Sequence, residues 1–268
     1  MSKAADILVI DDEQVVRDAV VKISSLDNYT VDAAANVKSA IEKISKNYYP
    51  IIVCDIMMPD GDGFQILDEL NNRNIYSSVI MTTGYSTVEN AVNSLYNGAI
   101  DFIPKPFTVD ELLSSVFRAN KYQQIKSRQK LFPLQNQNME LLYVTCPVQY
   151  LRLGYASWMF EERDGSVLIG VCDLFLKTIE SVKEIELHQA EEEIMQGISC
   201  ISITSVDERI HKMLAPVSGR IVEVNENIKL NSSLIEKDPY FEGWIYRVIP
   251  SAIDYEKKHL ILCSSETL

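Results

Sequence analysis

The stretch that most constrains this chain is a short apolar run that ends in an acid, from Ile51 to Asp55. The first four residues are Ile-Ile-Val-Cys, and three of them are β-branched, which is typical of a buried strand in a parallel sheet. Pro59 and the Asp-Gly-Asp-Gly of residues 60–63 predict a turn directly afterwards. A carboxylate at the carboxyl end of such a strand lies where open α/β sheets bind their ligands. Asp55 is therefore a candidate binding residue, although it could simply cap the following loop.

Strand-like and helix-like segments alternate five times within about the first 120 residues. Apolar runs predict strands at residues 7–10, 29–31, 51–54, 78–81 and 101–103. Apolar residues at helical spacing follow each run, which predicts a doubly wound, five-stranded parallel sheet with helices on both faces. Right-handed crossovers bring the carboxyl ends of such strands to one edge of the sheet. The polar residues at those ends are Asp11, Asp12, Asp55, Thr83 and Lys105.

The acids at this edge repel one another unless a cation lies among them. Carboxylates about 5 Å apart repel by roughly 3 kcal/mol per pair at an effective dielectric constant near 20. Carboxylate, carbonyl and water oxygens suit Mg²⁺, which leaves room for a phosphoryl oxygen. Lys105 and Thr83 supply a positive charge and a hydroxyl for the other phosphoryl oxygens. These residues predict that Asp55 is a nucleophile that accepts a phosphoryl group and forms an acyl phosphate.

Residues 1–120 resemble the receiver domain of two-component response regulators, and we place the boundary of this domain at residue 122. The matching motifs are Asp11-Asp12, Asp55 with Met57-Met58-Pro59-Asp60-Gly61, Thr83-Gly84 and Lys105-Pro106-Phe107. The resemblance implies that a sensor histidine kinase phosphorylates Asp55. It implies that Asp11, Asp12, Asp55 and the carbonyl of Met57 bind Mg²⁺, and that Lys105 contacts the phosphoryl group.

The same resemblance assigns Thr83 and Phe102 as a switch pair, in which the hydroxyl moves to the phosphoryl oxygen and the ring turns inward. Phe102 could instead be an ordinary core residue. No enzyme activity is expected beyond self-catalysed phosphotransfer and dephosphorylation, and a homodimer through the receiver domain is possible.

A polar connector follows the receiver-like part. Residues 109–130 keep a helical pattern without Gly or Pro and become polar after Tyr122, Pro133 ends the helix, and residues 135–138 (Gln-Asn-Gln-Asn) are a polar linker. We therefore interpret residues 123–144 as a helical extension and a linker. The extension could be a signalling stalk or dimer seam, or it could be a solvated spacer.

The second half of the chain predicts a mainly β domain, a sandwich or flattened barrel, over residues 145–251. Candidate strands lie at residues 157–160, 167–171, 183–187, 199–204, 220–224 and 244–249. Asp164-Gly165 is a hairpin signal, and Pro216 to Gly219 predict a tight turn. Residues 252–268 form a tail in which Leu260–Cys263 could add an edge strand or dock on a neighbour.

Three blocks of this half, residues 158–173, 215–225 and 231–244, resemble the H protein of the glycine cleavage system, which has a lipoyl-like fold. That family carries lipoate on a hairpin lysine in a Ser-Val-Lys motif, whereas this chain has Ser205-Val206-Asp207. Counting back from Pro216 instead places Glu208 at the position of the lipoyl lysine. Lys212 falls beyond the turn whether the position is found from the Ser-Val motif or from Pro216. Because neither Asp207 nor Glu208 can form the amide to lipoate, we expect no lipoate and an output through an unknown protein partner. The alternative is a lipoyl-type carrier, or a regulator of a lipoate-dependent complex, with a displaced lysine.

Composition excludes several other classes. The net charge is −13, and each half carries more acids than bases, so nucleic acid is not an expected partner and a transcription factor is disfavoured. His188, His211 and His259 lack metal-ligand spacing. The five cysteines are odd in number and widely spaced, which favours buried, reduced thiols. With no spanning or signal segment in the sequence, we expect a cytoplasmic protein without a membrane partner.

Overall fold

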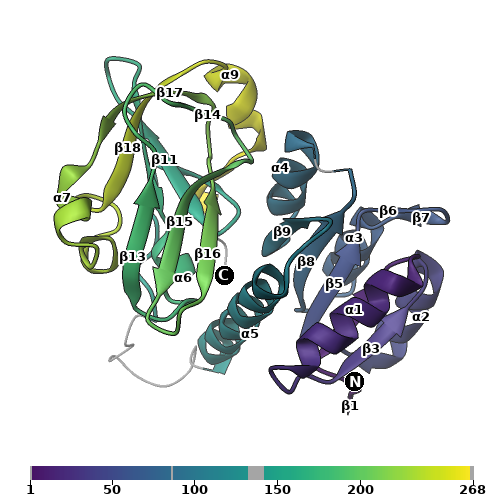
Figure 1. Ribbon diagram of the computed structural model, residues 1–268. Coiled ribbons are helices and arrows are strands. Elements are labelled where there is room, and N and C mark those ends of the chain that lie inside the picture. Colours follow the sequence, from purple (N-terminus) through teal and green to yellow (C-terminus); the bar gives the residue numbers. More distant parts are fainter. Residues whose placement is uncertain (1, 86, 132–141, 266–268) are drawn as a thin grey trace. The chain divides into compact units, whose positions relative to one another are not determined.

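The structure is a computed structural model that describes residues 2–85, 87–131 and 142–265 (Figure 1). The chain divides into two compact units, residues 1–86 with 97–128 and residues 87–96 with 129–268. Among the described residues, no helix is long and apolar enough to cross a membrane. The predicted Pro133 helix end and the polar linker at residues 135–138 lie outside the described residues.

The first unit contains the predicted five-stranded parallel sheet. Its strands, in spatial order, are β3 (Val31–Ala34), β2 (Ile7–Ile10), β5 (Ile51–Asp55), β8 (Ser78–Thr83) and β9 (Asp101–Pro104). Every residue of β2, β5 and β8 is buried, which explains why their sequences are apolar without alternation. The sheet therefore confirms the prediction and places β5 at its centre.

Strand β3 begins later than the predicted strand at residues 29–31. Thr30 instead lies in an irregular segment before the strand, where its backbone N–H and hydroxyl both donate to the Asp6 carboxylate. The strand itself reads Val-Asp-Ala-Ala, and the Asp32 carboxylate contacts Lys43 and the Tyr49 hydroxyl. The predicted strand at residues 29–31 therefore overlaps β3 only at Val31.

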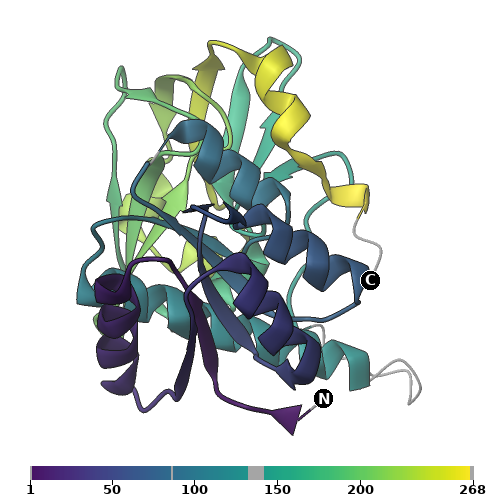
Figure 2. The ribbon, with the colours of Figure 1, turned by 90° about the vertical axis from the view of Figure 1, so that its right-hand side faces the viewer.

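Helices cover both faces of this sheet. In this unit they are α1 (Gln14–Ser25), α2 (Val37–Lys46), α3 (Phe64–Asn72) and α5 (Val109–Leu131), whereas α4 (Val88–Tyr96) belongs to the second unit. Figures 1 and 2 show α1 and α5 on one face and α2 and α3 on the other. Two-residue strands complete the unit: β1 (Ser2–Lys3) pairs with β4 (Asn47–Tyr48), and β6 (Met57–Met58) pairs with β7 (Gly61–Asp62). The β6–β7 hairpin is the turn predicted after Asp55.

The second unit is mainly antiparallel β structure, as predicted. A seven-stranded sheet has the order β14 (Glu193–Ile194), β17 (Gly219–Val224), β18 (Trp244–Pro250), β12 (Val167–Val171), β11 (Ser157–Glu161), β10 (Leu151–Leu153) and β19 (Ile261–Leu262). A three-stranded sheet has the order β13 (Val182–Leu187), β15 (Ser199–Ser205) and β16 (Ile210–Leu214). All of these pairings are antiparallel.

Short helices connect the strands of the second unit. They are α6 (Asp173–Leu176), α7 (Glu226–Leu230), α8 (Leu234–Lys237), α9 (Ile253–Glu256) and the 3₁₀ helices at Lys257–His259 and Cys263–Ser265. Strand β19 pairs antiparallel with β10. Of the two possibilities for Leu260–Cys263, the structure therefore contains the edge strand.

An aromatic cluster forms part of the core of the second unit. Trp158 is fully buried, and its ring centroid lies 5.0 Å from that of Tyr150 and 6.1 Å from that of Tyr240. Its indole N–H donates to the carbonyls of Val171 (3.0 Å) and Pro239 (3.1 Å). The indole thus joins β11 to the end of β12 and to the loop after α8.

Candidate functional site

The predicted acidic cluster forms at the carboxyl edge of the parallel sheet. Asp11 directly follows β2 and Asp55 ends β5, and both are buried, while the neighbouring Asp12 is exposed. One carboxylate oxygen from each of the three lies within 4.8 Å of the other two. This is the only group of three His, Cys, Asp or Glu side chains in residues 2–85, 87–131 and 142–265 that meets this spacing.

Lys105 lies between the two buried acids. Its Nζ atom is 2.7 Å from Asp11 Oδ2 and 2.7 Å from Asp55 Oδ2, and it is 3.8 Å from Glu13 Oε1. Burial opposes the charge of Lys105, but its hydrogen bonds to Asp11 and Asp55 raise its pKa overall, so it stays charged. Burial also raises the pKa of Asp11 against the opposing effect of Lys105.

The charges of this cluster do not balance. Three carboxylates and one ammonium leave two negative charges, which one divalent cation would neutralise. Oxygen donors in this number suit Mg²⁺, which keeps several of its waters. The cluster is therefore consistent with the predicted magnesium site.

Arg17 holds the acidic loop and was not identified from the sequence. Its guanidinium donates to the backbone carbonyls of Asp11 (2.6 Å) and Asp12 (2.9 Å), and the Glu13 N–H donates to Asp11 Oδ1. These bonds satisfy two backbone carbonyls just before α1, and the Glu13 N–H fixes the direction of the Asp11 side chain. The sequence signal that could have identified Arg17 is its position in the first turn of the helix, five residues after Asp12.

Gly63 is also required next to Asp55. Its N–H donates to the Ile56 carbonyl, and a Cβ at this position would lie 2.1 Å from the backbone oxygen of Asp55. A side chain there must displace the end of β5. We expect Gly63→Ala to slow phosphoryl labelling of the chain severalfold and to destabilise it by about 1–3 kcal/mol. Gly84→Ala is the matched control, because a Cβ at Gly84 meets no atom within 4 Å. Acyl-phosphate assays and urea titration measure both effects, and equal behaviour of the two variants would refute the clash.

The predicted switch residues lie on neighbouring strands. Thr83, the last residue of β8, is fully buried, and its hydroxyl oxygen accepts the Tyr85 N–H at 3.1 Å. Its carbonyl accepts the Lys105 N–H at 2.8 Å. Phe102 in β9 is buried, with 8% of its surface exposed. The Met57 N–H donates to Asp55 Oδ1 at 3.3 Å. The roles of Thr83, Phe102 and the Met57 carbonyl stay predictions.

The hairpin between β15 and β16 contains Asp207 and Glu208, the two positions that the sequence predicts for a degenerate lipoyl site. Its tip is Val206-Asp207-Glu208, with Glu208 at a φ of 64°. Asp207 Oδ2 lies 3.1 Å from Arg209 Nε, and Glu208 Oε1 lies 2.5 Å from Lys183 Nζ on β13. Lys212 lies within β16, beyond the tip. Both acids are therefore engaged in ion pairs, and no lysine lies at the tip.

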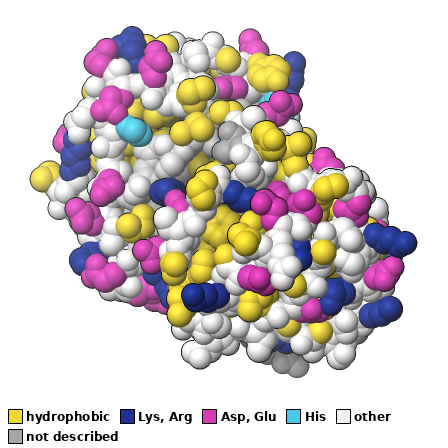
Figure 3. Space-filling model, turned by 45° about the vertical axis from the view of Figure 1, so that its right-hand side comes forward, with side chains coloured by type: hydrophobic (Ala, Val, Ile, Leu, Met, Phe, Trp, Pro, Cys, Tyr) yellow, Lys and Arg dark blue, Asp and Glu magenta, His cyan; other side chains and the backbone are white. Residues whose placement is uncertain are grey.

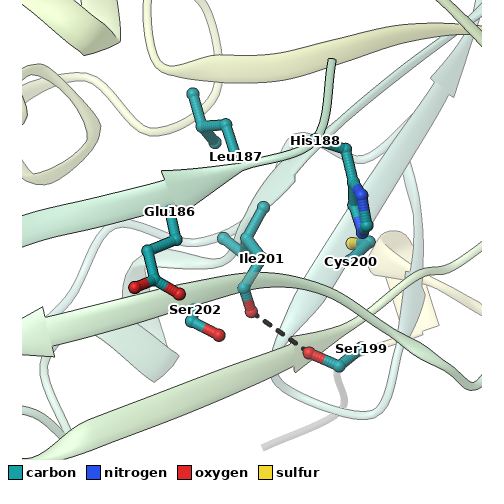
Figure 4. A pocket seen from close by; sticks show the side chains of 7 residues that line it. All are labelled: Glu186, Leu187, His188, Ser199, Cys200, Ile201 and Ser202. Atoms are coloured by element: carbon teal, nitrogen blue, oxygen red, sulfur yellow. Dashed lines mark hydrogen bonds between the residues drawn. The ribbon is translucent and has the colours of Figure 1, made fainter. Parts of the chain in front are cut away.

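A polar pocket of about 270 Å³ opens in the three-stranded sheet of the second unit (Figure 4). It is lined by Glu186, Leu187, His188, Ser199, Cys200, Ile201 and Ser202. His188 Nδ1 lies 2.5 Å from Glu192 Oε2, and this hydrogen bond lowers the pKa of Glu192. The histidines do not assemble into a metal site: His211 Nε2 contacts the Ser205 hydroxyl at 3.2 Å, and His259 packs against Tyr255.

The face of the molecule in Figure 3 carries acidic and basic side chains interspersed, without a continuous basic area. Together with the net charge of −13, this face offers little to a phosphate backbone.

Comparison with known families separates the chain into two parts. Residues 7–117 match the response regulator receiver domain, and residues 150–267 match the glycine cleavage H-protein. The chain therefore carries a receiver domain fused to an H-protein-like domain, which agrees with the parallel sheet of the first unit and the antiparallel sheets of the second.

Curated relatives match the first part only over a fraction of their length. The regulatory protein AtoC of Escherichia coli is 35% identical over 120 residues, and the C4-dicarboxylate transport transcriptional regulatory protein DctD of Rhizobium meliloti is 32% identical over 121 residues. Each match covers 45% of this chain and 26% of the relative. The chain thus spans about a quarter of the length of these relatives.

Solved structures resemble each part. A CheY-like receiver domain protein from Methanospirillum hungatei is 30% identical, with a TM-score of 0.43, and covers 47% of this chain and 99% of its own. A glycine cleavage system H protein from Mycobacterium marinum is 26% identical, with a TM-score of 0.36, and covers 42% of this chain and 97% of its own.

Proposed function

We propose that the chain is a response regulator that accepts a phosphoryl group on Asp55 from a sensor histidine kinase. The observation that carries this proposal is the position of Lys105, 2.7 Å from both Asp11 and Asp55 within a cluster of three acids. Buried acids bound to one lysine and short of two positive charges suit a phosphoryl-transfer site better than a structural ion pair.

In this proposal Asp55 Oδ attacks the phosphorus of phosphohistidine or acetyl phosphate. A new P–O bond forms, and the bond from phosphorus to the donor breaks. Lys105 and the Thr83 hydroxyl contact phosphoryl oxygens. The positive charge of Lys105 stabilises the negative charge of the phosphoryl group as this group is transferred to Asp55. Asp11, Asp12, Asp55 and the Met57 carbonyl would hold Mg²⁺. The cation supplies neutralising charge at the phosphoryl oxygens.

Removing the metal tests this assignment. We expect the chain to gain one phosphoryl group from acetyl phosphate with Mg²⁺ present and none detectable in excess EDTA. Intact-mass spectrometry at low temperature measures the adduct, and restored Mg²⁺ should restore labelling. Asp12→Ala should raise the Mg²⁺ concentration needed for half-maximal labelling by about tenfold or more. Labelling that is indifferent to EDTA would contradict the metal site.

We further propose that Thr83 and Phe102 transmit phosphorylation to the surface of the receiver domain. The buried hydroxyl of Thr83 lies at the same strand edge as Asp55, and Phe102 lies on the adjacent strand. A cytoplasmic location and a possible receiver homodimer belong to the same proposal. The domain boundaries that we propose are residues 1–122, 123–144, 145–251 and 252–268, although the H-protein match continues to residue 267.

For the second domain we propose a protein-interaction output that works without lipoate. The support is the hairpin tip, where Asp207 and Glu208 pair with Arg209 and Lys183 and no lysine is present. The second candidate is a lipoyl-type carrier with a displaced attachment site. Lys212 and Lys183 lie near the tip and are the residues that such a carrier would use.

Lipoylation separates the two candidates. Co-expression with a lipoate ligase and lipoate should leave the intact mass of the wild-type chain unchanged, because no lysine lies at the hairpin tip. Asp207→Lys is the matched control, since it restores the Ser-Val-Lys order at residues 205–207 and should acquire a lipoyl group if the ligase recognises the domain. A lipoyl adduct on wild-type Lys212 or Lys183 would overturn the proposed output and favour the carrier.

A further inference from the structure

Three cysteines that are far apart in the sequence meet in the core of the H-protein-like domain. Cys146 precedes β10, Cys172 precedes α6, and Cys263 follows β19. All three are buried in one cluster with Tyr150, Trp158 and Tyr240. The proposed phosphorylation site and the hairpin tip make no use of them.

Two of these thiols point directly at each other. The Sγ atoms of Cys146 and Cys263 lie 2.6 Å apart, with Cys263 as the donor, and Cys146 also forms a hydrogen bond with Cys172. Ordinary contacts between non-bonded heavy atoms lie at about 3.5–4.0 Å, whereas a disulfide bond measures about 2.05 Å. The fold therefore brings the sulfur atoms of Cys146 and Cys263 close to bonding distance.

The other two cysteines lie apart from this group. Cys54 Sγ donates to the Asp55 carbonyl in the receiver domain, and Cys200 Sγ donates to the Met213 carbonyl in the three-stranded sheet. The three clustered sulfurs also fail the spacing of a metal site, which only the acidic group at Asp55 meets among the described residues. A covalent link between two thiols fits these positions better than a bound soft metal.

We propose that Cys146 and Cys263 form a reversible disulfide, with Cys172 as a thiol that can exchange into it. Hydrogen peroxide is the oxidant. The Cys263 sulfur takes one peroxide oxygen and becomes a sulfenic acid, and the other oxygen leaves as water. The Cys146 sulfur then attacks this sulfur; the S–S bond forms, the S–O bond breaks, and the hydroxyl leaves as water with the Cys146 proton. A dithiol reductant returns the disulfide to two thiols and is itself oxidised to a disulfide.

The order of events follows from the positions of the two residues. Cys263 follows a two-residue edge strand, and its N–H donates to the Tyr150 carbonyl at 3.0 Å. Such a short edge strand opens at a lower free energy than a central strand, so peroxide reaches Cys263 first. Hydrogen bonds to Cys172 and Cys263, together with burial, raise the pKa of Cys146, which makes Cys146 the less reactive of the two thiols toward peroxide.

The disulfide would fix β19 to the edge of the seven-stranded sheet. In the dithiol form, β19 is held by its pairing with Leu151 and Arg152 of β10 and can detach, which exposes that edge. The bond closes a long loop between residues 146 and 263 and thus restricts the unfolded chain. We therefore expect oxidation to raise the melting temperature of the second domain by about 5 °C or more.

Mild peroxide treatment of the full chain, followed by alkylation and peptide mapping, tests the proposal. Two of the five thiols should disappear, the Cys146 and Cys263 peptides should be linked, and dithiothreitol should restore both thiols. Cys200→Ser, which removes a buried thiol outside the cluster, should give the same link. Cys263→Ser should instead yield a Cys146–Cys172 link.

Three results would overturn the proposal. They are retention of all five thiols at peroxide levels that oxidise a free cysteine peptide, a link that involves Cys54 or Cys200, and oxidation to sulfinic acid without a link. Asp55→Asn should form the same disulfide as wild type, so the outcome is independent of phosphorylation. An unchanged melting temperature in a chain proven to be linked would refute the fixing of β19.

Discussion

Asp55→Asn is expected to abolish phosphoryl labelling of this chain. The amide keeps the shape and the hydrogen-bonding reach of the carboxylate, so Lys105 and Asp11 retain a polar neighbour in this buried site. It lacks the anionic oxygen that must attack phosphorus, and it removes one of the three negative charges that attract Mg²⁺. The expected loss is complete within detection, by at least about 100-fold in initial rate.

Acid-labile incorporation from radiolabelled acetyl phosphate measures this loss. Asp68→Asn is the matched control, since Asp68 is an exposed acid on α3 outside the cluster, and the same change of atoms there should leave labelling unchanged. Far-ultraviolet circular dichroism should be the same for both variants. If Asp55→Asn labels at even a tenth of the wild-type rate, another residue is the acceptor.

Much of this site could be predicted from sequence because its residues stand next to strong signals. Asp55 closes an apolar run of β-branched residues, and Lys105 follows the last strand by one residue. Once the alternation of strands and helices predicts a parallel sheet, the polar residues at strand ends must lie near each other. The convergence of Asp11, Asp12, Asp55 and Lys105 follows from that geometry.

The residues and strands that the sequence did not predict depend on contacts that leave no local pattern in the sequence. Arg17 acts through its guanidinium on two backbone carbonyls, and Gly63 acts through the space that it leaves beside Asp55. Strand β16 carries His211 and Lys212 between apolar residues, and the two-residue strands β14 and β19 are too short for any periodicity. The meeting of Cys146 with Cys263 depends on the pairing of β10 with β19; β10 was not predicted, and an edge strand at β19 was one of two possibilities.

Trp158→Ala is expected to cause the largest loss of stability in the second domain. The indole is fully buried against Tyr150 and Tyr240, and its N–H satisfies the carbonyls of both Val171 and Pro239. Removing the ring leaves a cavity and two buried carbonyls without this donor. The expected cost is about 3–5 kcal/mol of unfolding free energy. Trp158→Phe should cost about 1–3 kcal/mol, because it removes the donor while keeping most of the apolar volume.

Gly170 shows how closely the ring is enclosed, since a Cβ there would lie 2.5 Å from a Trp158 ring carbon. Urea unfolding of the full chain, followed by near-ultraviolet circular dichroism, measures these costs. Trp244→Ala is the matched control, because Trp244 is only partly buried at the margin of the same cluster and stacks near Arg247. Its cost should be less than half that of Trp158→Ala. Equal costs would mean that the aromatic cluster does not hold the domain together.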